Sequence, residues 1–130
     1  MSEVKCRILY VDDNEDSAEM FKLILSGPDF EVEIALSIAE AIERAKSESF
    51  DLYVLDKRLP DGSGLELCTR LNALTPDVPC IFYTGDAYET HRQEAVAAGA
   101  SASAFVPKPD VERLIATVHE LLAERECATA

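Results

Sequence analysis

The chain has 130 residues, of which 48% are hydrophobic, so it has the size and apolar content of one globular domain with a real core. Its formal net charge of −13 and sequence pI near 4.4 argue against direct binding to nucleic acid or to an anionic membrane, because such contacts need clustered Lys and Arg. The sequence shows no membrane-spanning apolar run and no signal peptide, so we expect a cytoplasmic protein.

The first half of the chain contains three candidate strands, each followed by polar or turn-forming residues. We expect these strands at residues 6–11, 30–36 and 52–55. Asn14 is a typical N-cap for a first helix, which ends at Ser26-Gly27-Pro28. Ser37 and Glu40 form a capping box that predicts a second helix. The third strand is apolar throughout, which is typical of a strand covered on both faces.

The second half of the chain continues the alternation. After Gly64, apolar residues recur at helical spacing up to Leu74, and a strand is expected at residues 80–84. An Ala-rich stretch, residues 88–98, predicts a weakly packed, mobile helix. A short strand is expected at residues 102–106. Asp110 then caps a last amphipathic helix, and the end of the chain is expected to fray.

Strand and helix therefore alternate five times with short connections. This order predicts an α/β fold in which helices cover both faces of a doubly wound parallel sheet. We expect one domain over residues 1–130, with a core at about residues 5–125 and a short C-terminal tail. The four cysteines are not arranged as CxxC pairs, so we expect reduced thiols, no disulfide framework and no structural zinc site.

Polar residues follow four of the predicted strands at their carboxyl ends, which share one edge of a parallel sheet. They are Asp12 and Asp13, Asp56, Thr84 and Lys108. Three carboxylates brought together repel each other unless a cation joins them, and Mg²⁺ prefers oxygen ligands. A hydroxyl and an ammonium group beside that cation would suit a phosphoryl group.

Four segments in this order, YVDDNED, VLDKRLPDGSGLEL, IFYTGDA and AFVPKPD, resemble the response regulator receiver domains of two-component signalling over essentially the whole chain. The resemblance implies a flavodoxin-like (βα)5 fold with strand order 2-1-3-4-5. It also implies that Asp56 accepts a phosphoryl group from a phosphohistidine on a sensor kinase or a histidine phosphotransfer protein.

The resemblance further implies roles for the neighbouring residues. Asp13 and Asp56 would bind Mg²⁺ directly, with Mn²⁺ as a substitute, and Asp12 would act mainly through water. The main-chain carbonyl of Arg58 would be another ligand. Lys108 would contact a phosphoryl oxygen and Thr84 would move to hydrogen-bond the phosphoryl group. Phe105 would change rotamer with Thr84, as part of a switch on the surface of the fourth helix, fifth strand and fifth helix.

Some residues have two interpretations. Lys57, Arg58 and Asp86 are either solvated loop charges or groups that tune the lifetime of the aspartyl phosphate. Thr84 and Phe105 could be ordinary strand residues, and His91 and His119 are expected at the surface. A metal-dependent phosphatase is disfavoured, since that class needs a second Asp two residues after the nucleophile, where Arg58 stands.

We therefore expect a signalling module that catalyses its own phosphorylation and dephosphorylation and is not a classical enzyme. The alternative is a receiver-like binding platform that works without phosphorylation. The length leaves no room for an output domain, so output would pass through protein contacts or onward phosphotransfer, unless the chain is part of a longer protein. The sequence does not identify the kinase, the output partner, the pathway, the phosphoryl lifetime or the oligomeric state.

Overall fold

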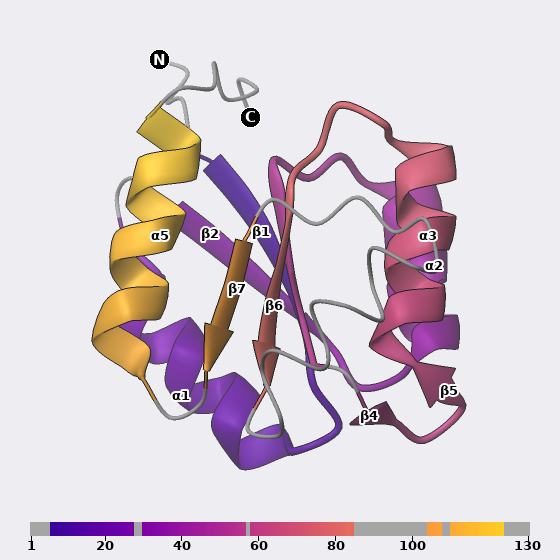
Figure 1. Ribbon diagram of the computed structural model, residues 1–130, viewed down its shortest axis with the longest axis horizontal. Helices are drawn as coiled ribbons and strands as arrows, with labels where there is room; N and C mark the ends of the chain where they lie inside the picture. Colours follow the sequence, from indigo (N-terminus) through magenta and orange to yellow (C-terminus); the bar gives the residue numbers. More distant parts are fainter. Residues whose placement is uncertain (1–5, 28–29, 57, 85–103, 108–109, 124–130) are drawn as a thin grey trace.

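The structure is a computed structural model that describes residues 6–27, 30–56, 58–84, 104–107 and 110–123. Strands and helices alternate along most of this chain (Figure 1). In chain order the elements are β1 (Cys6–Val11), α1 (Glu15–Leu25), β2 (Phe30–Ala35), α2 (Ile38–Ser47), β3 (Leu52–Leu55), β4 (Arg58–Leu59), β5 (Gly62–Ser63), α3 (Gly64–Leu74), β6 (Cys80–Thr84), β7 (Ala104–Pro107) and α5 (Val111–Ala123).

The main sheet has the order β2-β1-β3-β6-β7, and all its described pairings are parallel. This is the predicted order 2-1-3-4-5, because β6 and β7 are the fourth and fifth strands of the alternation. β1 lies in the interior of the sheet, where Val11 is opposite Ala35 of β2 and Leu55 of β3. The register brings the carboxyl ends of β1 and β3 to one edge of the sheet.

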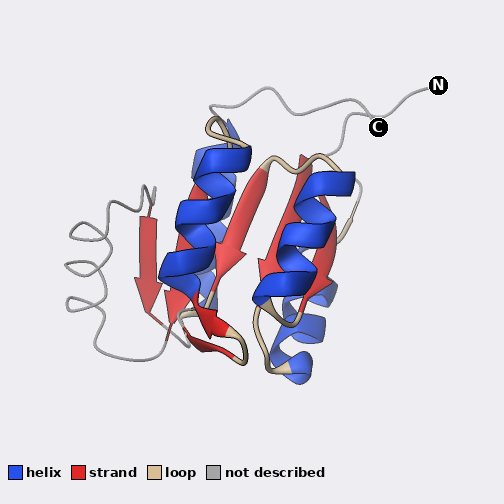
Figure 2. Cartoon of the chain, turned by 90° about the vertical axis from the view of Figure 1, so that its right-hand side faces the viewer, coloured by secondary structure: helices blue, strands red, loops and turns tan. Residues whose placement is uncertain are grey.

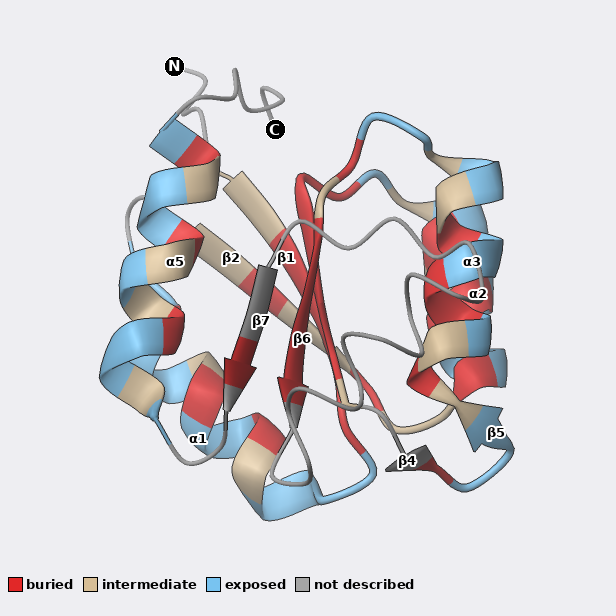
Figure 3. Cartoon of the chain, viewed as in Figure 1, coloured by how far each residue is buried: buried red, intermediate tan, exposed pale blue. Residues whose placement is uncertain are grey.

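The helices cover both faces of the sheet, which confirms the doubly wound fold. Figures 1 and 2 show α2 and α3 on one face, and in Figure 1 α1 and α5 lie on the other. Each pair of helices encloses its own hydrophobic cluster, one containing Leu67 and Phe82 and the other containing Phe21 and Leu114. Buried residues follow the strands and the inward sides of the helices in Figure 3. The fully apolar β3 is buried along its whole length because it is covered from both sides.

The predicted helix caps are present. The Asn14 side chain accepts a hydrogen bond from the amide of Ser17, and the Ser37 side chain accepts one from the amide of Glu40. The Glu40 carboxylate accepts a hydrogen bond from the amide of Leu36, whereas a capping box would use the amide of the next residue, Ser37. Asp110 accepts from the amide of Arg113 at the start of α5. These polar residues fix where each helix begins.

Several details differ from the sequence-based expectations. The turn-rich segment after Asp56 forms a small antiparallel hairpin, β4–β5, that was not predicted. β2 ends at Ala35 and β7 extends to Pro107, within the usual uncertainty of element ends. Ile24 and Leu74, which their helical spacing predicts on the apolar faces of the first and third helices, are 46% and 43% exposed. The predicted helix at residues 88–98 lies outside the described residues.

The cysteines correct one expectation. Cys68 and Cys80 are free and buried, as predicted. Cys6 is disulfide-bonded, so the expectation that all four thiols are reduced is wrong. Disulfides are rare in the reducing cytosol, so this bond does not support the predicted location. Within the described residues, none of the helices has the length and hydrophobicity that a membrane span requires.

Candidate metal and phosphoryl site

Backbone hydrogen bonds continue past the ends of β1 and β3 and hold the residues that follow. The amide of Asp12 donates to the carbonyl of Ala35 at 3.1 Å, and the amide of Asp56 donates to the carbonyl of Val11 at 3.0 Å. Each aspartate is therefore fixed to the neighbouring strand at its own main chain. This arrangement positions the carboxylates without using their side chains.

The three predicted aspartates meet at this edge of the sheet. One carboxylate oxygen each from Asp12, Asp13 and Asp56 lies within 4.8 Å of the others. Asp12 is buried, Asp56 is half-buried and Asp13 is exposed, so the cluster is open to solvent on one side. Like charges this close favour a bound cation, and a set of carboxylate oxygens suits a hard ion such as Mg²⁺. The donor set therefore fits the predicted metal.

The most deeply buried of these carboxylates is held at both oxygens. The Tyr10 hydroxyl donates to Asp12 Oδ2 at 3.1 Å, and the amide of Asn14 donates to Oδ1 at 3.0 Å. Burial, followed by the charge of Asp12, raises the pKa of Tyr10 well above its usual range, so the phenol keeps its proton as the donor. The sequence places Tyr10 in the first predicted strand, and Tyr10 was not among the predicted site residues. Its position two residues before Asp12, on the same strand face, was a usable signal.

The β4–β5 hairpin follows Asp56 and is fastened to α2. The Asp61 carboxylate accepts from the amides of Ile38 and Ala39 at 2.8 and 3.0 Å, which lowers the pKa of Asp61. Gly62 has a φ of +151°, and a Cβ there would lie 2.7 Å from Ile38 Cδ1. Only glycine therefore fits this turn without a shift. The sequence did not reveal this cap, because its donor and acceptor lie more than 20 residues apart.

The hairpin bears on one predicted ligand. The main chain of Arg58 forms the first residue of β4, opposite Ser63 of β5. Asp61 therefore anchors the short segment that contains the Arg58 carbonyl. Whether that carbonyl binds a metal stays a prediction.

The remaining predicted site residues are only partly described. Thr84 is the last residue of β6 and pairs in register with Pro107, which directly precedes Lys108. Phe105 lies on β7 opposite Phe82. The side chains of Thr84 and Phe105 lie outside the described residues, as do Lys57, Asp86, His91 and Lys108 in full. Their predicted roles stay predictions. His119 is exposed, as expected.

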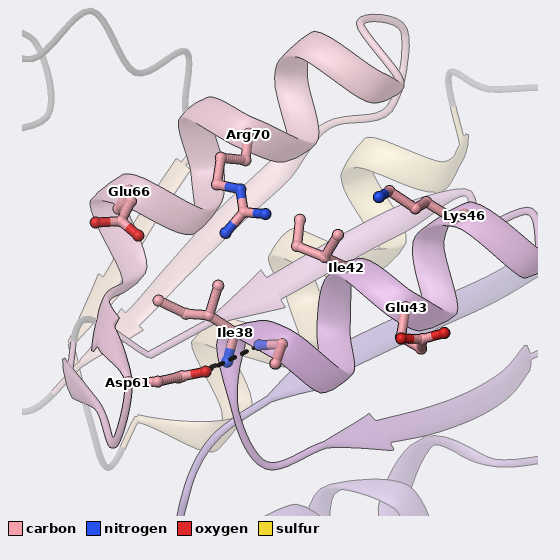
Figure 4. Close-up of a pocket in the computed structure, with 8 residues that line it drawn as sticks. Ile38, Ile42, Glu43, Lys46, Asp61, Glu66 and Arg70 are labelled. Carbon is pink, nitrogen blue, oxygen red and sulfur yellow. Dashed lines mark hydrogen bonds between the residues drawn. The ribbon is translucent and has the colours of Figure 1, made fainter.

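A cavity of about 290 Å³ lies between α2 and α3, beside the hairpin (Figure 4). Charged side chains from both helices line it, with Glu43 and Lys46 on α2 and Glu66 and Arg70 on α3. Asp61 borders this cavity, but Asp12, Asp13 and Asp56 do not. The cavity is therefore separate from the acidic cluster, and none of the predicted site residues lines it.

Known proteins resemble this chain in both sequence and fold. The response regulator receiver domain family matches residues 8–119. The response regulator MprA of Mycobacterium ulcerans is 35% identical over 117 residues, which cover 89% of this chain and 50% of that protein. The chain spans about half the length of the curated relatives it matches.

Two solved structures extend the resemblance. The non-phosphorylated receiver domain of HemR from Leptospira biflexa is 34% identical, with a TM-score of 0.81, and the match covers 92% of this chain and 95% of that one. TrrA from Thermotoga maritima, solved in complex with Mg²⁺ and BeF, is 31% identical, with a TM-score of 0.78 and coverage of 90% and 99%. Since the family match extends from β1 into α5, the chain belongs to the response regulator receiver domain family.

Proposed function

We propose that this chain is a phosphoacceptor signalling module in which Asp56 receives a phosphoryl group from a phosphohistidine. The single observation that carries the proposal is the convergence of Asp12, Asp13 and Asp56 within 4.8 Å at the carboxyl edge of the sheet. Membership of the receiver domain family supports the same assignment. Asp56 is half-buried, so its carboxylate is both fixed by its strand and accessible to a donor.

Asp13 and Asp56 would hold Mg²⁺ directly, Asp12 would hold it mainly through water, and the Arg58 carbonyl would add another oxygen. Mn²⁺ offers the same preference for oxygen ligands and would substitute. When bound, the cation offsets the repulsion between the Asp56 carboxylate and the anionic phosphoryl group. The Mg²⁺ and BeF in the solved structure of TrrA support this choice of ion.

The transfer itself moves one phosphoryl group. An Asp56 oxygen forms a bond to phosphorus while the bond between phosphorus and the donor imidazole nitrogen breaks, and the electron pair stays on that nitrogen. The donor becomes a neutral histidine because the other ring nitrogen of the phosphohistidine carries a proton, and Asp56 becomes an acyl phosphate. Lys108 would neutralise a phosphoryl oxygen as the bond forms. Water later attacks the acyl phosphate, which releases inorganic phosphate and regenerates the Asp56 carboxylate, so the chain would act on itself and would not be a classical enzyme.

Phosphorylation would be read out beside the site. A phosphoryl group adds about −1.5 to −2 charge at neutral pH, which would draw in the Thr84 hydroxyl. The pairing of β6 with β7 supports a coupled response, because Thr84 and Phe105 lie on adjacent strands. The surface of the predicted fourth helix, the fifth strand and the fifth helix would then change its contacts with an output protein. The upstream partner would be a sensor kinase or a phosphotransfer protein, in the cytoplasm.

Incubation with Mg²⁺ and acetyl phosphate tests the phosphoacceptor directly. Intact-mass measurement should show one added phosphoryl group on the parent and none on Asp56→Asn. Asp77→Asn is the matched control, because Asp77 is an exposed aspartate in the loop that precedes β6, and it should label like the parent. A parent that labels neither from acetyl phosphate nor from phosphohistidine donors would contradict the proposal and favour a binding platform.

Mg²⁺ should also stabilise the folded chain, because the cation binds the native carboxylate cluster and not the unfolded chain. At ten times its dissociation constant, the gain in free energy of unfolding is about 1.4 kcal/mol by mass action. Thermal unfolding across a Mg²⁺ series measures the gain. The absence of any shift at millimolar Mg²⁺ would contradict the metal assignment.

A further inference from the structure

One buried group outside the predicted site is connected to it directly. Tyr10 lies on β1 with 2% of its surface exposed, and its hydroxyl donates to Oδ2 of Asp12, which is itself only 1% exposed. Residues two apart on a strand share a face, so the strand itself aims the phenol at the carboxylate. A tyrosine that served only the core would not need a partner in the acidic cluster.

The Tyr10 ring is itself held in place. It stacks on Phe21 of α1 with ring centroids 4.3 Å apart and an interplanar angle of 22°. α1 begins just after the turn in which the Asn14 amide binds the other oxygen of Asp12. One donor, Tyr10, precedes Asp12 in the sequence and lies on the strand, and the other, the Asn14 amide, follows Asp12 and lies in the turn. Together they fix the rotation of the Asp12 carboxylate.

We propose that Tyr10 is a positioning residue for the divalent cation and acts through Asp12. This inference rests on the proposed function, because it assumes that the carboxylate cluster binds a cation. Each carboxylate oxygen has two acceptor lone pairs, so the bond from Tyr10 orients Oδ2 without using its whole capacity. Hydrogen bonds to metal-binding groups hold those groups in their binding orientation, and their loss typically weakens metal affinity.

The test is the Mg²⁺ dissociation constant of Tyr10→Phe, measured by calorimetric titration. This change removes only the hydroxyl and keeps the ring that stacks on Phe21. We expect about tenfold weaker Mg²⁺ binding than in the parent. Tyr53→Phe is the matched control, since the buried Tyr53 hydroxyl hydrogen-bonds the Thr75 hydroxyl at 2.9 Å, away from the acidic cluster. It should lose stability in a similar way and keep the parent's Mg²⁺ affinity.

A second measurement needs no variant. In parent protein with labelled tyrosines, the Tyr10 ring signals should shift on Mg²⁺ addition with the same dissociation constant as the calorimetry, and the Tyr53 signals should stay in place. Two results would overturn the inference and leave the proposed function intact. One is an equal Mg²⁺ affinity for Tyr10→Phe and Tyr53→Phe, and the other is that the Tyr10 signals do not shift when Mg²⁺ is added. A parent that binds no Mg²⁺ would overturn both.

Discussion

Charged residues gather at both edges of the sheet, and the two groups differ in how their charge is arranged. At the amino edge, Arg7 of β1 forms ion pairs with Glu31 at 3.1 Å and Glu48 at 2.7 Å. The same guanidinium donates to the carbonyl of Ser49 and lies 4.9 Å from the centre of the Phe50 ring. One cation therefore joins β2, the end of α2 and the start of β3.

At the carboxyl edge, the same strand leads into like charges. Asp12 and Asp13 follow β1, Asp56 follows β3, and their oxygens lie within 4.8 Å of one another. At the amino edge, Glu31 and Glu48 each form an ion pair with Arg7, and these pairs stabilise the fold. The carboxyl edge concentrates one sign of charge, which costs stability and prepares a site for a ligand. Removal of one carboxylate charge should therefore lower the free energy of unfolding at the amino edge and raise it at the carboxyl edge.

Removal of the central cation should have the largest effect on stability. Arg7→Met keeps much of the aliphatic length but removes the cation that Glu31 and Glu48 share, and within the described residues only Glu48 of the two keeps an ion pair, with Arg44 at 3.3 Å. We expect a loss of about 2 kcal/mol in free energy of unfolding, because half-buried ion pairs are costly to break on one side. The free energy of unfolding of Arg7→Lys should lie between those of the parent and Arg7→Met, since an ammonium keeps the charge but cannot reproduce the forked contacts. Urea unfolding measures both, and a parent-like Arg7→Met would contradict the structural role of this cluster.

Neutralisation of one acidic partner should have a smaller, pH-dependent effect. The hydrogen bond from Arg7 holds the pKa of Glu48 below its ordinary value of 4.5, so the stabilisation is present above that pH and is lost as pH falls through the lowered pKa. Glu48→Gln should cost about 1 kcal/mol at pH 7, given its partial exposure. The difference from the parent should shrink below pH 4.5. Glu43→Gln, on the exposed side of α2, should change stability little at any pH, and a constant deficit in Glu48→Gln would argue against the ionic contribution.

The same type of change at the carboxyl edge should have the smallest effect and the opposite sign. Asp13→Asn removes one of three neighbouring negative charges, so it should raise the free energy of unfolding by about 0.5 kcal/mol without divalent cations, as expected for an exposed charge. In saturating Mg²⁺ the order should reverse, because the variant has lost a ligand. Thermal unfolding with and without Mg²⁺ measures both signs. Destabilisation under both conditions would break the contrast between the two edges.

The positions of the strands could be predicted from local signals, whereas their order came from the resemblance to receiver domains. The continuous apolar runs that end at Val11 and Leu55 gave strand positions that the structure confirms, and alternation with helices predicted a parallel sheet. The meeting of the three aspartates was expected from the parallel sheet, since parallel strands present their carboxyl ends at one edge. This part of the site required no knowledge of side-chain contacts.

What could not be predicted depends on contacts between distant segments. The two-residue strands β4 and β5 are too short to show any periodicity, and their residues are typical of turns. Asp61 reads as a turn residue until α2 is placed beside it. Tyr10 is apolar enough to pass as core within its strand, and its hydroxyl acquires a role only when Asp12 is found buried beside it. The disulfide of Cys6 could not be predicted, because the sequence shows four cysteines without a spacing that indicates which of them pair.

The order of strands also places the acidic residues and the predicted switch residues on strands that differ in their number of neighbours. β1 and β3, which carry the acidic residues, each have neighbours on both sides, so moving Asp12 or Asp56 would mean breaking two ladders at once. β7, which carries Phe105 and leads to Lys108, lies at the end of the order and is paired with β6 alone. Because a strand with one neighbour is easier to displace than a strand with two, we expect any movement that follows phosphorylation to be larger at β7 than at β1 or β3.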